Sequence, residues 1–280
     1  MSFRFANVAG RSALVDDNSK WFDLHKLTGG VVSADPMQAL ADPAALHAAA
    51  AGLAHATADG DLASAQLLAP VPAPRNCFAV GLNYRTHVAE SGMEVPSVPL
   101  VFTKFPSCIV GPDATVELQS TTADYEVELV VVIGAGGRNI AAADAWAHVS
   151  GLTIGQDISD RMLQFAAKPP HFDLAKSRDG YGPIGPVVVS TDLFANPDDL
   201  AMVCDISGER RQDDRTTSLI FDVPVLIEYL SALITLAPGD IIFTGTPAGV
   251  GSATGKFLKP GDVIESTIEG IGTLITHCVA

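Results

Sequence analysis

After position 75, apolar residues fall into short runs that alternate with Gly-Pro and Pro-Gly turns, a pattern typical of a strand-rich fold. Gly182-Pro183 and Gly185-Pro186 are interpreted as two of these turns. Helices are predicted at 141–149 and 222–234, where apolar residues recur every three to four positions. Many strands and few helices indicate an α+β fold whose body is a rolled or barrel-like sheet. The apolar runs predict strands at 77–81, 99–103, 108–110, 126–134, 152–157, 186–190, 201–206, 240–244, 263–268 and 272–278.

The first part of the chain has a different pattern. Residues 1–35 show the apolar positions of short strands and turns, whereas alanine dominates from Met37 to Leu68, with leucines spaced mainly as in helices. The run 70–74 alternates proline with other residues, which ends any helix and favours an extended connector. We therefore predict a small N-terminal α/β domain at 1–70 and a larger domain at 75–280.

Composition and charge narrow the kinds of protein that this chain can be. Hydrophobic residues make up 48% and charged residues 18%, which indicates a globular protein. No apolar run reaches the roughly 18 residues of a membrane span, and the N-terminus lacks the apolar stretch of a secretory signal, so we expect a cytoplasmic protein. The formal net charge of −15 argues against nucleic acid or an anionic membrane as a partner. The 4 cysteines are scattered, so neither a zinc site nor a disulfide framework is indicated.

Two glutamates on one predicted strand are the most informative chemical feature. Glu126 and Glu128 lie in the run 124–134, which is otherwise mostly apolar. A strand's period of two places both carboxylates on the same face, where like charges repel and resist desolvation. A divalent cation that prefers hard oxygen ligands is the simplest group to hold them together. The alternative is a solvated edge strand with two surface glutamates.

A third carboxylate, Asp157, ends the next predicted apolar strand. With Glu126 and Glu128 it would complete three protein carboxylates around one octahedral cation, the arrangement that magnesium or manganese prefers. Histidine and cysteine are absent from these segments, which disfavours zinc. The alternative is that Asp157 caps a turn or a helix, since Ser159 and Asp160 follow it.

His87 and Glu90 stand three residues apart, between Gly81 and Gly92. On a short helix this spacing brings both side chains to one face, within hydrogen-bonding reach. A carboxylate beside an imidazole orients the ring and makes it a better base for activating water. The flanking glycines are consistent with a lid that orders on binding. The alternative is an ordinary surface pair.

Positively charged residues are few, so their placement matters. Arg161 and Gln164 follow Asp157 by four and seven residues, the spacing of one helical face that begins at the aspartate. Lys104 and Lys176 lie near the predicted strands of the same region. Each of these groups could offset the carboxylates or bind a substrate anion. For the lysines, the alternative is a solvated surface position.

Thr246 lies in a glycine-rich turn, 244–251, that follows the apolar strand predicted at 240–244. The turn is not a phosphate-binding loop, because it lacks the G-x-x-x-x-G-K-[ST] spacing and its lysine. Its backbone amides and the Thr246 hydroxyl could still bind a carboxylate or carbonyl oxygen.

Taken in order, these segments resemble the fumarylacetoacetate hydrolase family, especially its small acylpyruvase-like members. The resemblance extends from about Cys77 to Cys278 and includes little of residues 1–70. The motifs that carry it are G-L-N-Y-x-x-H-x-x-E, F-x-K, D-Y-E-x-E-L, R-x-x-Q, K-S, G-P-x-G-P, P-G-D-x-I-x-T-G-T-P-x-G-V-G and I-E-G-I-G.

The resemblance implies a mixed β-roll catalytic domain at 75–280, a homodimer, and a bound Mg²⁺ or Mn²⁺ ion. It implies that the metal ligands are Glu126, Glu128 and Asp157. It also implies that His87 and Glu90 form a water-activating pair and that Lys176 is a further catalytic group. The residues that it implies for substrate contact are Arg161, Gln164 and Thr246. Gln156 and Met162 depart from the family pattern, which commonly has asparagine and an acid there. These departures concern the shape of the substrate more than the metal.

The reaction implied by the resemblance is hydrolysis of a carbon–carbon bond in a small-molecule 2,4-dioxo acid, an acylpyruvate or a diketo-deoxy sugar acid. The intact pair of His87 and Glu90 favours hydrolysis, because decarboxylation needs no general base for water. An oxaloacetate-type decarboxylase and a keto–enol isomerase would use the same metal–enolate site and remain alternatives. A non-catalytic protein stabilised by the metal is the other alternative.

Overall fold

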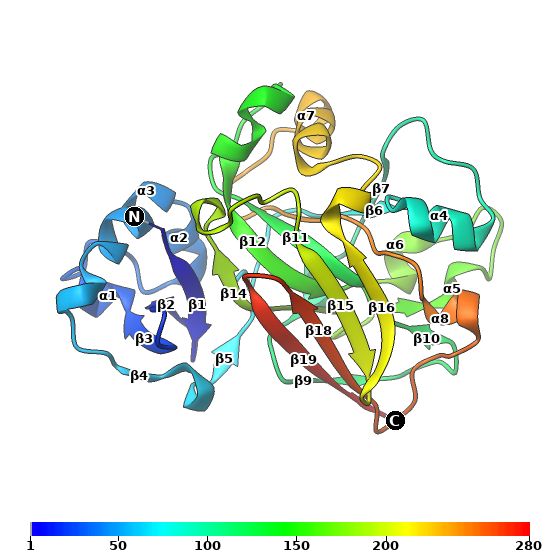
Figure 1. Cartoon of the computed structure of the whole chain (residues 1–280), viewed down its shortest axis with the longest axis horizontal. Coiled ribbons are helices and arrows are strands. Elements are labelled where there is room, and N and C mark those ends of the chain that lie inside the picture. The colour runs from blue at the N-terminus through cyan, green and yellow to red at the C-terminus, as the bar shows by residue number, and fades with distance from the viewer. Residues whose placement is uncertain (1) are drawn as a thin grey trace.

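A computed structural model describes residues 2–280, and Figure 1 shows its strands gathered in a large body with a smaller lobe at one end. The strands of the lobe are β1 (Arg4–Val8), β2 (Arg11–Val15), β3 (Lys20–Asp23), β4 (Gly60–Asp61) and β5 (Leu67–Leu68). The strands of the body are β6 (Cys77–Gly81), β7 (Leu100–Thr103), β8 (Ile109–Val110), β9 (Ala114–Glu117), β10 (Ala123–Asp124), β11 (Val127–Ile133), β12 (Val149–Gln156), β13 (Ser159–Asp160), β14 (Gly182–Val189), β15 (Ala201–Ile206), β16 (Glu209–Arg215), β17 (Ile241–Phe243), β18 (Val263–Ile268) and β19 (Gly272–Val279).

The strands form mixed sheets. The largest has 12 strands in the order β4-β3-β2-β1-β14-β12-β11-β17-β6-β7, with β5 paired to β1 and β8 paired to β14. A second sheet of 5 strands has the order β16-β15-β18-β19-β9, and β10 pairs with β13. Most pairs are antiparallel, but β6–β17, β8–β14 and β9–β19 are parallel. The strand-rich α+β architecture predicted from the sequence is therefore confirmed.

The N-terminal lobe also holds the short helices α1 (Leu24–Leu27), α2 (Pro36–Leu40) and α3 (Pro43–Ala50). Two Asp-Pro pairs divide the alanine-rich region, because the side chains of Asp35 and Asp42 each accept a backbone N–H and cap the helix that follows. Beyond α3 the chain forms the 3₁₀ turns η1 (Leu53–His55) and η2 (Leu62–Ser64) and the short strands β4 and β5. The helices expected between α3 and Leu68 are therefore wrong.

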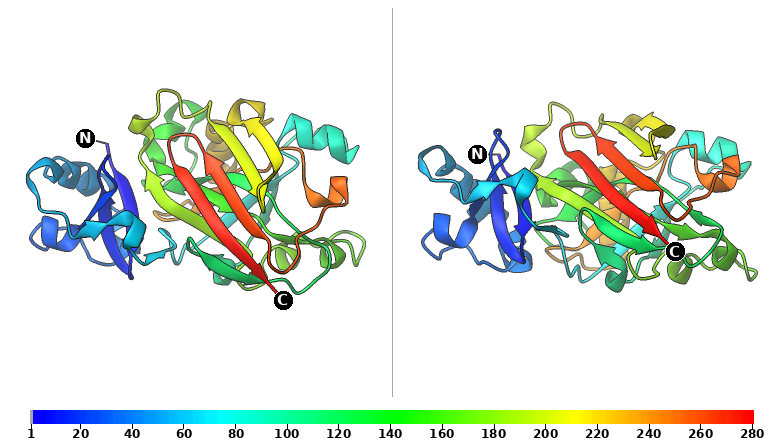
Figure 2. Two further views of the ribbon diagram at one scale, coloured as in Figure 1. Left: turned by 60° about the horizontal axis from the view of Figure 1, so that its bottom comes forward. Right: turned by 90° about the horizontal axis from the view of Figure 1, so that it is seen from below.

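The lobe is joined to the body through the central sheet. Strand β1 pairs with β2 and β5 inside the lobe, and with β14 of the body through Arg4↔Val189 and Phe5↔Val188. Figure 2 shows the lobe at the end of the molecule, where it extends one edge of the sheet. The division into domains at 1–70 and 75–280 stays a prediction, because this strand pairing crosses it.

The two sheets of the body pack face to face. Strands β11, β12 and β14 lie against β15, β18 and β19. Every residue of β11 and of β12 is buried, as expected for strands covered on both faces. Helix α7 (Val223–Leu233) buries Leu226, Ile227 and Leu230 and packs against the 3₁₀ segment η4 (Ala142–His148).

Three details of the body differ from the sequence prediction. The segment expected as a helix at 141–149 forms η4, a 3₁₀ helix. Gly182-Pro183 and Gly185-Pro186, interpreted as turns, lie inside β14. Strand β16 was not predicted, because only Gln212 of its seven mostly charged residues is buried, and this edge strand carries no apolar signal.

The end of the body away from the lobe carries short helices, as Figure 1 shows. They are α4 (Arg85–Ser91), α5 (Arg161–Gln164), α6 (Phe172–Ala175) and α8 (Gly251–Thr254). The remaining 3₁₀ turns are η3 (Pro106–Cys108), η5 (Thr191–Leu193) and η6 (Thr216–Ser218). Among residues 2–280, no helix has the length and apolar character to cross a membrane.

Candidate active site

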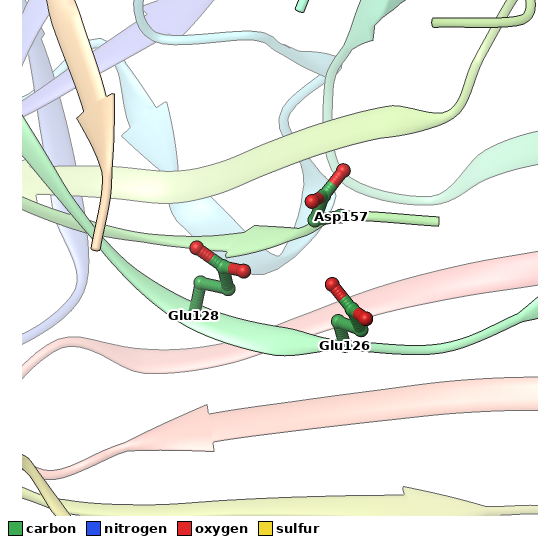
Figure 3. A group of neighbouring side chains, drawn as sticks. All are labelled: Glu126, Glu128 and Asp157. Atoms are coloured by element: carbon green, nitrogen blue, oxygen red, sulfur yellow. The ribbon is translucent and has the colours of Figure 1, made fainter. Parts of the chain in front are cut away.

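Three buried carboxylates converge where β11 begins and β12 ends. Antiparallel pairing of these strands sets Glu128 opposite Gly155, and the Asp157 amide continues the ladder to the Glu126 carbonyl at 2.9 Å. Glu126 and Glu128 therefore project from one face of the same chain segment toward Asp157, as Figure 3 shows. One carboxylate oxygen from each residue lies within 4.8 Å of the others. The sequence prediction that these side chains come together agrees with this geometry.

Cationic side chains offset two of the three carboxylates. Lys176 Nζ donates to Glu126 Oε2 at 2.6 Å and to Asp157 Oδ2 at 2.7 Å. Arg161 Nη2 donates to the other oxygen of Glu126. The fully buried Lys104 donates to Asp157 Oδ1 at 2.7 Å. Neither lysine is a solvated surface cation, so that alternative fails for both.

Glu128 lacks such a partner. Its Oε2 accepts the Gly245 amide at 2.7 Å, and it forms no ion pair with any residue from 2 to 280. Burial, and then the negative charges of Asp157 and Glu126, raise the pKa of Glu128 well above its usual value. Burial would also raise the pKa of Glu126, but Lys176 and then Arg161 outweigh it and hold that pKa well below its usual value. Glu128 is thus the carboxylate that a bound cation would stabilise most.

His87 and Glu90 form a hydrogen-bonded pair on helix α4. His87 Nδ1 lies 2.7 Å from Glu90 Oε1, and the other Glu90 oxygen accepts the Gly249 amide at 2.9 Å. Because an ionised carboxylate only accepts hydrogen bonds, Nδ1 carries the proton and Nε2 is left to act as a base. The side chain of His87 is 14% exposed and lines the pocket described below.

Arg161 and Gln164 act together, although not as expected. The helix that carries them begins at Arg161, after strand β13, so the predicted helical face that begins at Asp157 is wrong. Arg161 Nη1 donates to Gln164 Oε1 at 2.9 Å, and Arg161 Nε donates to Asp124 Oδ2 at 2.8 Å. This arrangement leaves the Gln164 amide N–H groups available to the pocket.

Thr246 lies against the start of β11. Its hydroxyl donates to the Val127 carbonyl at 2.9 Å and accepts from Gln212 Nε2 at 2.8 Å. Gln212 Oε1 in turn accepts the Val127 amide at 3.0 Å. The hydroxyl proton of Thr246 is therefore committed inside the protein, and its role as a substrate-binding group stays a prediction.

One pocket of about 280 Å³ contains these groups. Its floor is polar and includes the three carboxylates together with His87, Arg161, Gln164, Lys176 and Thr246. Its walls are mostly apolar and are formed by Val80, Leu82, Met93, Leu100, Phe102, Phe165, Pro170 and Phe172. Of the predicted site residues, two are not in the lining: Glu90, which lies behind His87, and Lys104, which is fully buried against Asp157. A small pocket with convergent polar groups on an apolar background is typical of an active site.

The sequence interpretation gave no role to two residues that organise this pocket. Asp124 is fully buried, holds Arg161 Nε, and accepts the amides of Gly251 and Ser252 at the start of α8. Gln212 joins β16 to the beginning of β11. Asp124 lies in the D-Y-E-x-E-L motif, and its position just before the predicted strand is the feature of the sequence that could have indicated its role. No feature of the sequence could have indicated Gln212, because its strand is almost entirely charged.

Known proteins are similar to this chain in sequence and in fold. The family profile described as Fumarylacetoacetate (FAA) hydrolase C-terminal matches residues 76–279. The mitochondrial oxaloacetate tautomerase FAHD2A of Homo sapiens is 42% identical over 216 residues, covering 76% of this chain and 69% of that protein. A crystal structure from Mycobacterium smegmatis aligns with 99% of this chain and 99% of its own, with a TM-score of 0.91 and 44% identity. The maleylpyruvate hydrolase of Sphingobium sp. SYK-6, crystallised with manganese(II) and pyruvate, aligns with 99% of this chain and 98% of its own, with a TM-score of 0.82 and 28% identity.

Proposed function

Because the chain belongs to the fumarylacetoacetate hydrolase family, we propose that it hydrolyses a carbon–carbon bond in 2,4-dioxo acids, either acylpyruvates or diketo-deoxy sugar acids. The observation that carries the proposal is the presence of His87, supported by Glu90, in the same pocket as three buried carboxylates. A base for water beside a site for a divalent cation is the combination that this hydrolysis needs.

The donor set of the site fits a hard divalent cation. Glu126, Glu128 and Asp157 offer only carboxylate oxygens, and Glu128 is buried with no ion-pair partner among residues 2–280. When bound there, Mg²⁺ or Mn²⁺ supplies Lewis-acid polarisation of the keto oxygens of the substrate. Oxygen ligands suit both ions, so we propose Mg²⁺ or Mn²⁺ without choosing between them.

The residues of this chain have distinct tasks in the proposed reaction. His87 Nε2 removes a proton from a water molecule, whose oxygen then bonds to the carbon of the 4-oxo group. Glu90 holds the imidazole by Nδ1, and Gly249 holds Glu90. The Gln164 amide donates to the oxyanion that forms on the attacked carbon, and Lys176 adds positive charge beside it.

The reaction is completed by cleavage of the bond between carbons 3 and 4. Its electron pair stays on carbon 3 as an enolate, and the proton held at His87 Nε2 is delivered to that carbon. The products are a carboxylic acid and a pyruvate-type acid. Arg161 retains N–H groups beyond its three hydrogen bonds, and these can bind the carboxylate of the substrate.

The variant His87→Ala tests this proposal. We expect pyruvate release from an acylpyruvate to fall by about 10²–10⁴-fold, since general base catalysis is typically worth that much. His55→Ala, at an exposed histidine of the N-terminal lobe, is the matched control and should hydrolyse at the wild-type rate. Hydrolysis by His87→Ala at the wild-type rate would show that this pair does not activate water.

A second candidate is keto–enol isomerisation or decarboxylation of oxaloacetate at the same site. The name of the Homo sapiens relative, an oxaloacetate tautomerase, favours it. Neither reaction needs attack by water. Turnover of oxaloacetate that survives His87→Ala, together with no cleavage of any 2,4-dioxo acid by the wild type, would support this candidate over hydrolysis.

We also propose that the protein is a homodimer, from the family resemblance alone, and that it is cytoplasmic, as expected in the sequence analysis. Light scattering on the purified protein would give its mass, for comparison with 29.1 kDa for one chain. A monomeric mass would contradict the dimer. Several relatives are named as mitochondrial, so the compartment needs its own test by cell fractionation.

A further inference from the structure

Two successive backbone amides at the start of β11 are held by glutamine side chains instead of by backbone carbonyls. The Glu126 amide donates to Gln156 Oε1 at 2.9 Å, and the Val127 amide donates to Gln212 Oε1 at 3.0 Å. Strand β17 pairs with β11 only at residues 130–132, so Val127 lies beyond the end of that neighbouring strand. Buried backbone N–H groups need partners, and here the two glutamines supply them.

Gln156 connects the amide of Glu126 to the opposite sheet. The residue belongs to β12 and is fully buried. Its Nε2 donates to Ser266 Oγ at 2.8 Å, on β18, and to Cys204 Sγ at 3.4 Å, on β15. Both strands belong to the five-stranded sheet that packs on β11 and β12. One side chain therefore bridges the two sheets at the first of the three carboxylates.

Gln212 makes a second connection, from β16 of the same five-stranded sheet. Its Nε2 donates to Thr246 Oγ1 at 2.8 Å and to the Pro247 carbonyl at 2.9 Å. The Thr246 hydroxyl in turn donates to the Val127 carbonyl at 2.9 Å. Both polar groups of the Val127 backbone are thus held, one by Gln212 directly and the other through Thr246.

Neither glutamine is among the residues that line the active-site pocket. Gln156 therefore does not contact a substrate there, although it replaces the asparagine that is common in the family. Asparagine is one methylene shorter, and from the same backbone position it could not keep both the bond to the Glu126 amide and the bond to Ser266 at these lengths. This departure from the family pattern acts on the chain segment that carries Glu126.

We infer that Gln156 and Gln212 are positioning residues for the divalent cation. They fix the peptide groups immediately before and after Glu126, and so hold its carboxylate and that of Glu128 in the places that a single ion requires. The inference rests on the cation of the proposed function and does not depend on hydrolysis. Ligands that are held before the ion arrives need not be ordered when it binds, and loss of such supporting partners typically weakens metal affinity by about 10–100-fold.

Titration of the metal-free protein with Mn²⁺ tests the inference without substrate. The EPR signal of the free aqueous ion gives the dissociation constant. Gln156→Met and Gln212→Met keep the length of the side chain and remove its amide. We expect each variant to weaken Mn²⁺ binding by about 10–100-fold. The EPR spectrum of the bound ion should also change, because its ligands lose their fixed geometry. The two variants act at different sites in the fold, so either one can give the answer if the other does not fold.

Asn7→Leu is the matched control. Asn7 is also a buried amide that binds backbone, since its Nδ2 donates to the Ala69 carbonyl at 2.9 Å, but it lies on β1 in the N-terminal lobe. Loss of a buried hydrogen bond should lower the Tm in all three variants. Only the glutamine variants should change the dissociation constant and the EPR spectrum, which separates positioning of the ligands from a general loss of stability.

Failure of the inference and failure of the proposed function give different results. If the wild type binds Mn²⁺ and a glutamine variant binds it equally tightly with the same spectrum, the role given to that glutamine is overturned. If the wild type binds no Mn²⁺, the proposed cation is contradicted and the inference with it. If the wild type binds Mn²⁺ but releases no pyruvate from acylpyruvates, hydrolysis is contradicted, and the ratio of dissociation constants still decides the inference.

Discussion

Replacing Glu128 by glutamine should stabilise the metal-free protein and abolish its response to metal. Glu128 is buried, accepts a single backbone N–H, and has a carboxylate oxygen within 4.8 Å of oxygens from Glu126 and Asp157. At an effective dielectric constant of about 20, two unit charges at that distance repel by about 3.5 kcal/mol. Lys176, Lys104 and Arg161 offset part of this repulsion, so we expect a net gain of about 1–3 kcal/mol in the free energy of unfolding for Glu128→Gln.

The assay is thermal unfolding in EDTA and in Mg²⁺. For a chain of this length, 1 kcal/mol corresponds to about 2 °C, so Glu128→Gln should raise the Tm in EDTA by about 2–6 °C. Mg²⁺ at about 100 times its Kd should stabilise the wild type by about 2.7 kcal/mol, or about 5 °C, and should not shift the variant. Glu265→Gln, at an exposed position on β18, is the matched control and should behave as the wild type in both conditions.

The gain from Glu128→Gln should also depend on pH. Because the pKa of Glu128 is raised in the folded protein, its carboxyl is protonated in both states below the usual value of 4.5 and costs nothing there. Above that pH the unfolded chain ionises while the folded protein resists ionisation, so the wild type loses stability. The advantage of the variant should therefore grow as the pH rises from about 4.5 toward neutrality. A variant that is less stable than the wild type in EDTA and still responds to Mg²⁺ would refute this reasoning.

Two other substitutions should destabilise the protein by disturbing residues that hold the site in place. Lys104→Met should lower the free energy of unfolding by about 3–5 kcal/mol, because it removes the buried cation that donates to Asp157 Oδ1 and to two backbone carbonyls, and leaves only Lys176 to offset that carboxylate. A change below about 1 kcal/mol in chemical denaturation would contradict the role given to this lysine. Gly249→Ala should be destabilised and should lose most hydrolysis, since its φ is +108° and a Cβ would lie 2.0 Å from the Arg211 carbonyl oxygen. Gly255→Ala is the control, because Gly255 has φ +73° and no atom lies within 4 Å of a Cβ there. It should lower the free energy of unfolding by only about 1 kcal/mol and keep its activity. Similar activity losses in the two glycine variants would show that the contact at Gly249 is unimportant.

Local pattern was enough to predict the strands that carry the site, but not how they pair. The alternation around Glu126 and Glu128 places both carboxylates on one face whatever the strand's neighbours are. The position of Asp157 beside them depends on the register of β11 against β12, which rests on contacts between distant segments. From its position alone, Asp157 is a candidate third ligand with a turn or helix cap as the alternative, and the family resemblance favours the ligand.

Features fixed by tertiary contacts were missed for physical reasons. Strand β16 is charged along most of its length, and Gln212 is recognisable only from its bonds to Val127 and Thr246. The helix at Arg161 begins after β13 because the Asp160 side chain caps it, which local spacing from Asp157 could not show. Burial of Lys104 likewise depends on its bond to Asp157, made across the fold.

The most direct test of the account is a crystal structure of the protein grown with Mn²⁺, with anomalous scattering measured to locate the metal. We expect one peak per chain, within coordination distance of an oxygen of each of Glu126, Glu128 and Asp157. Density that places these side chains apart, with no peak between them, would contradict the central claim that they hold a single divalent ion.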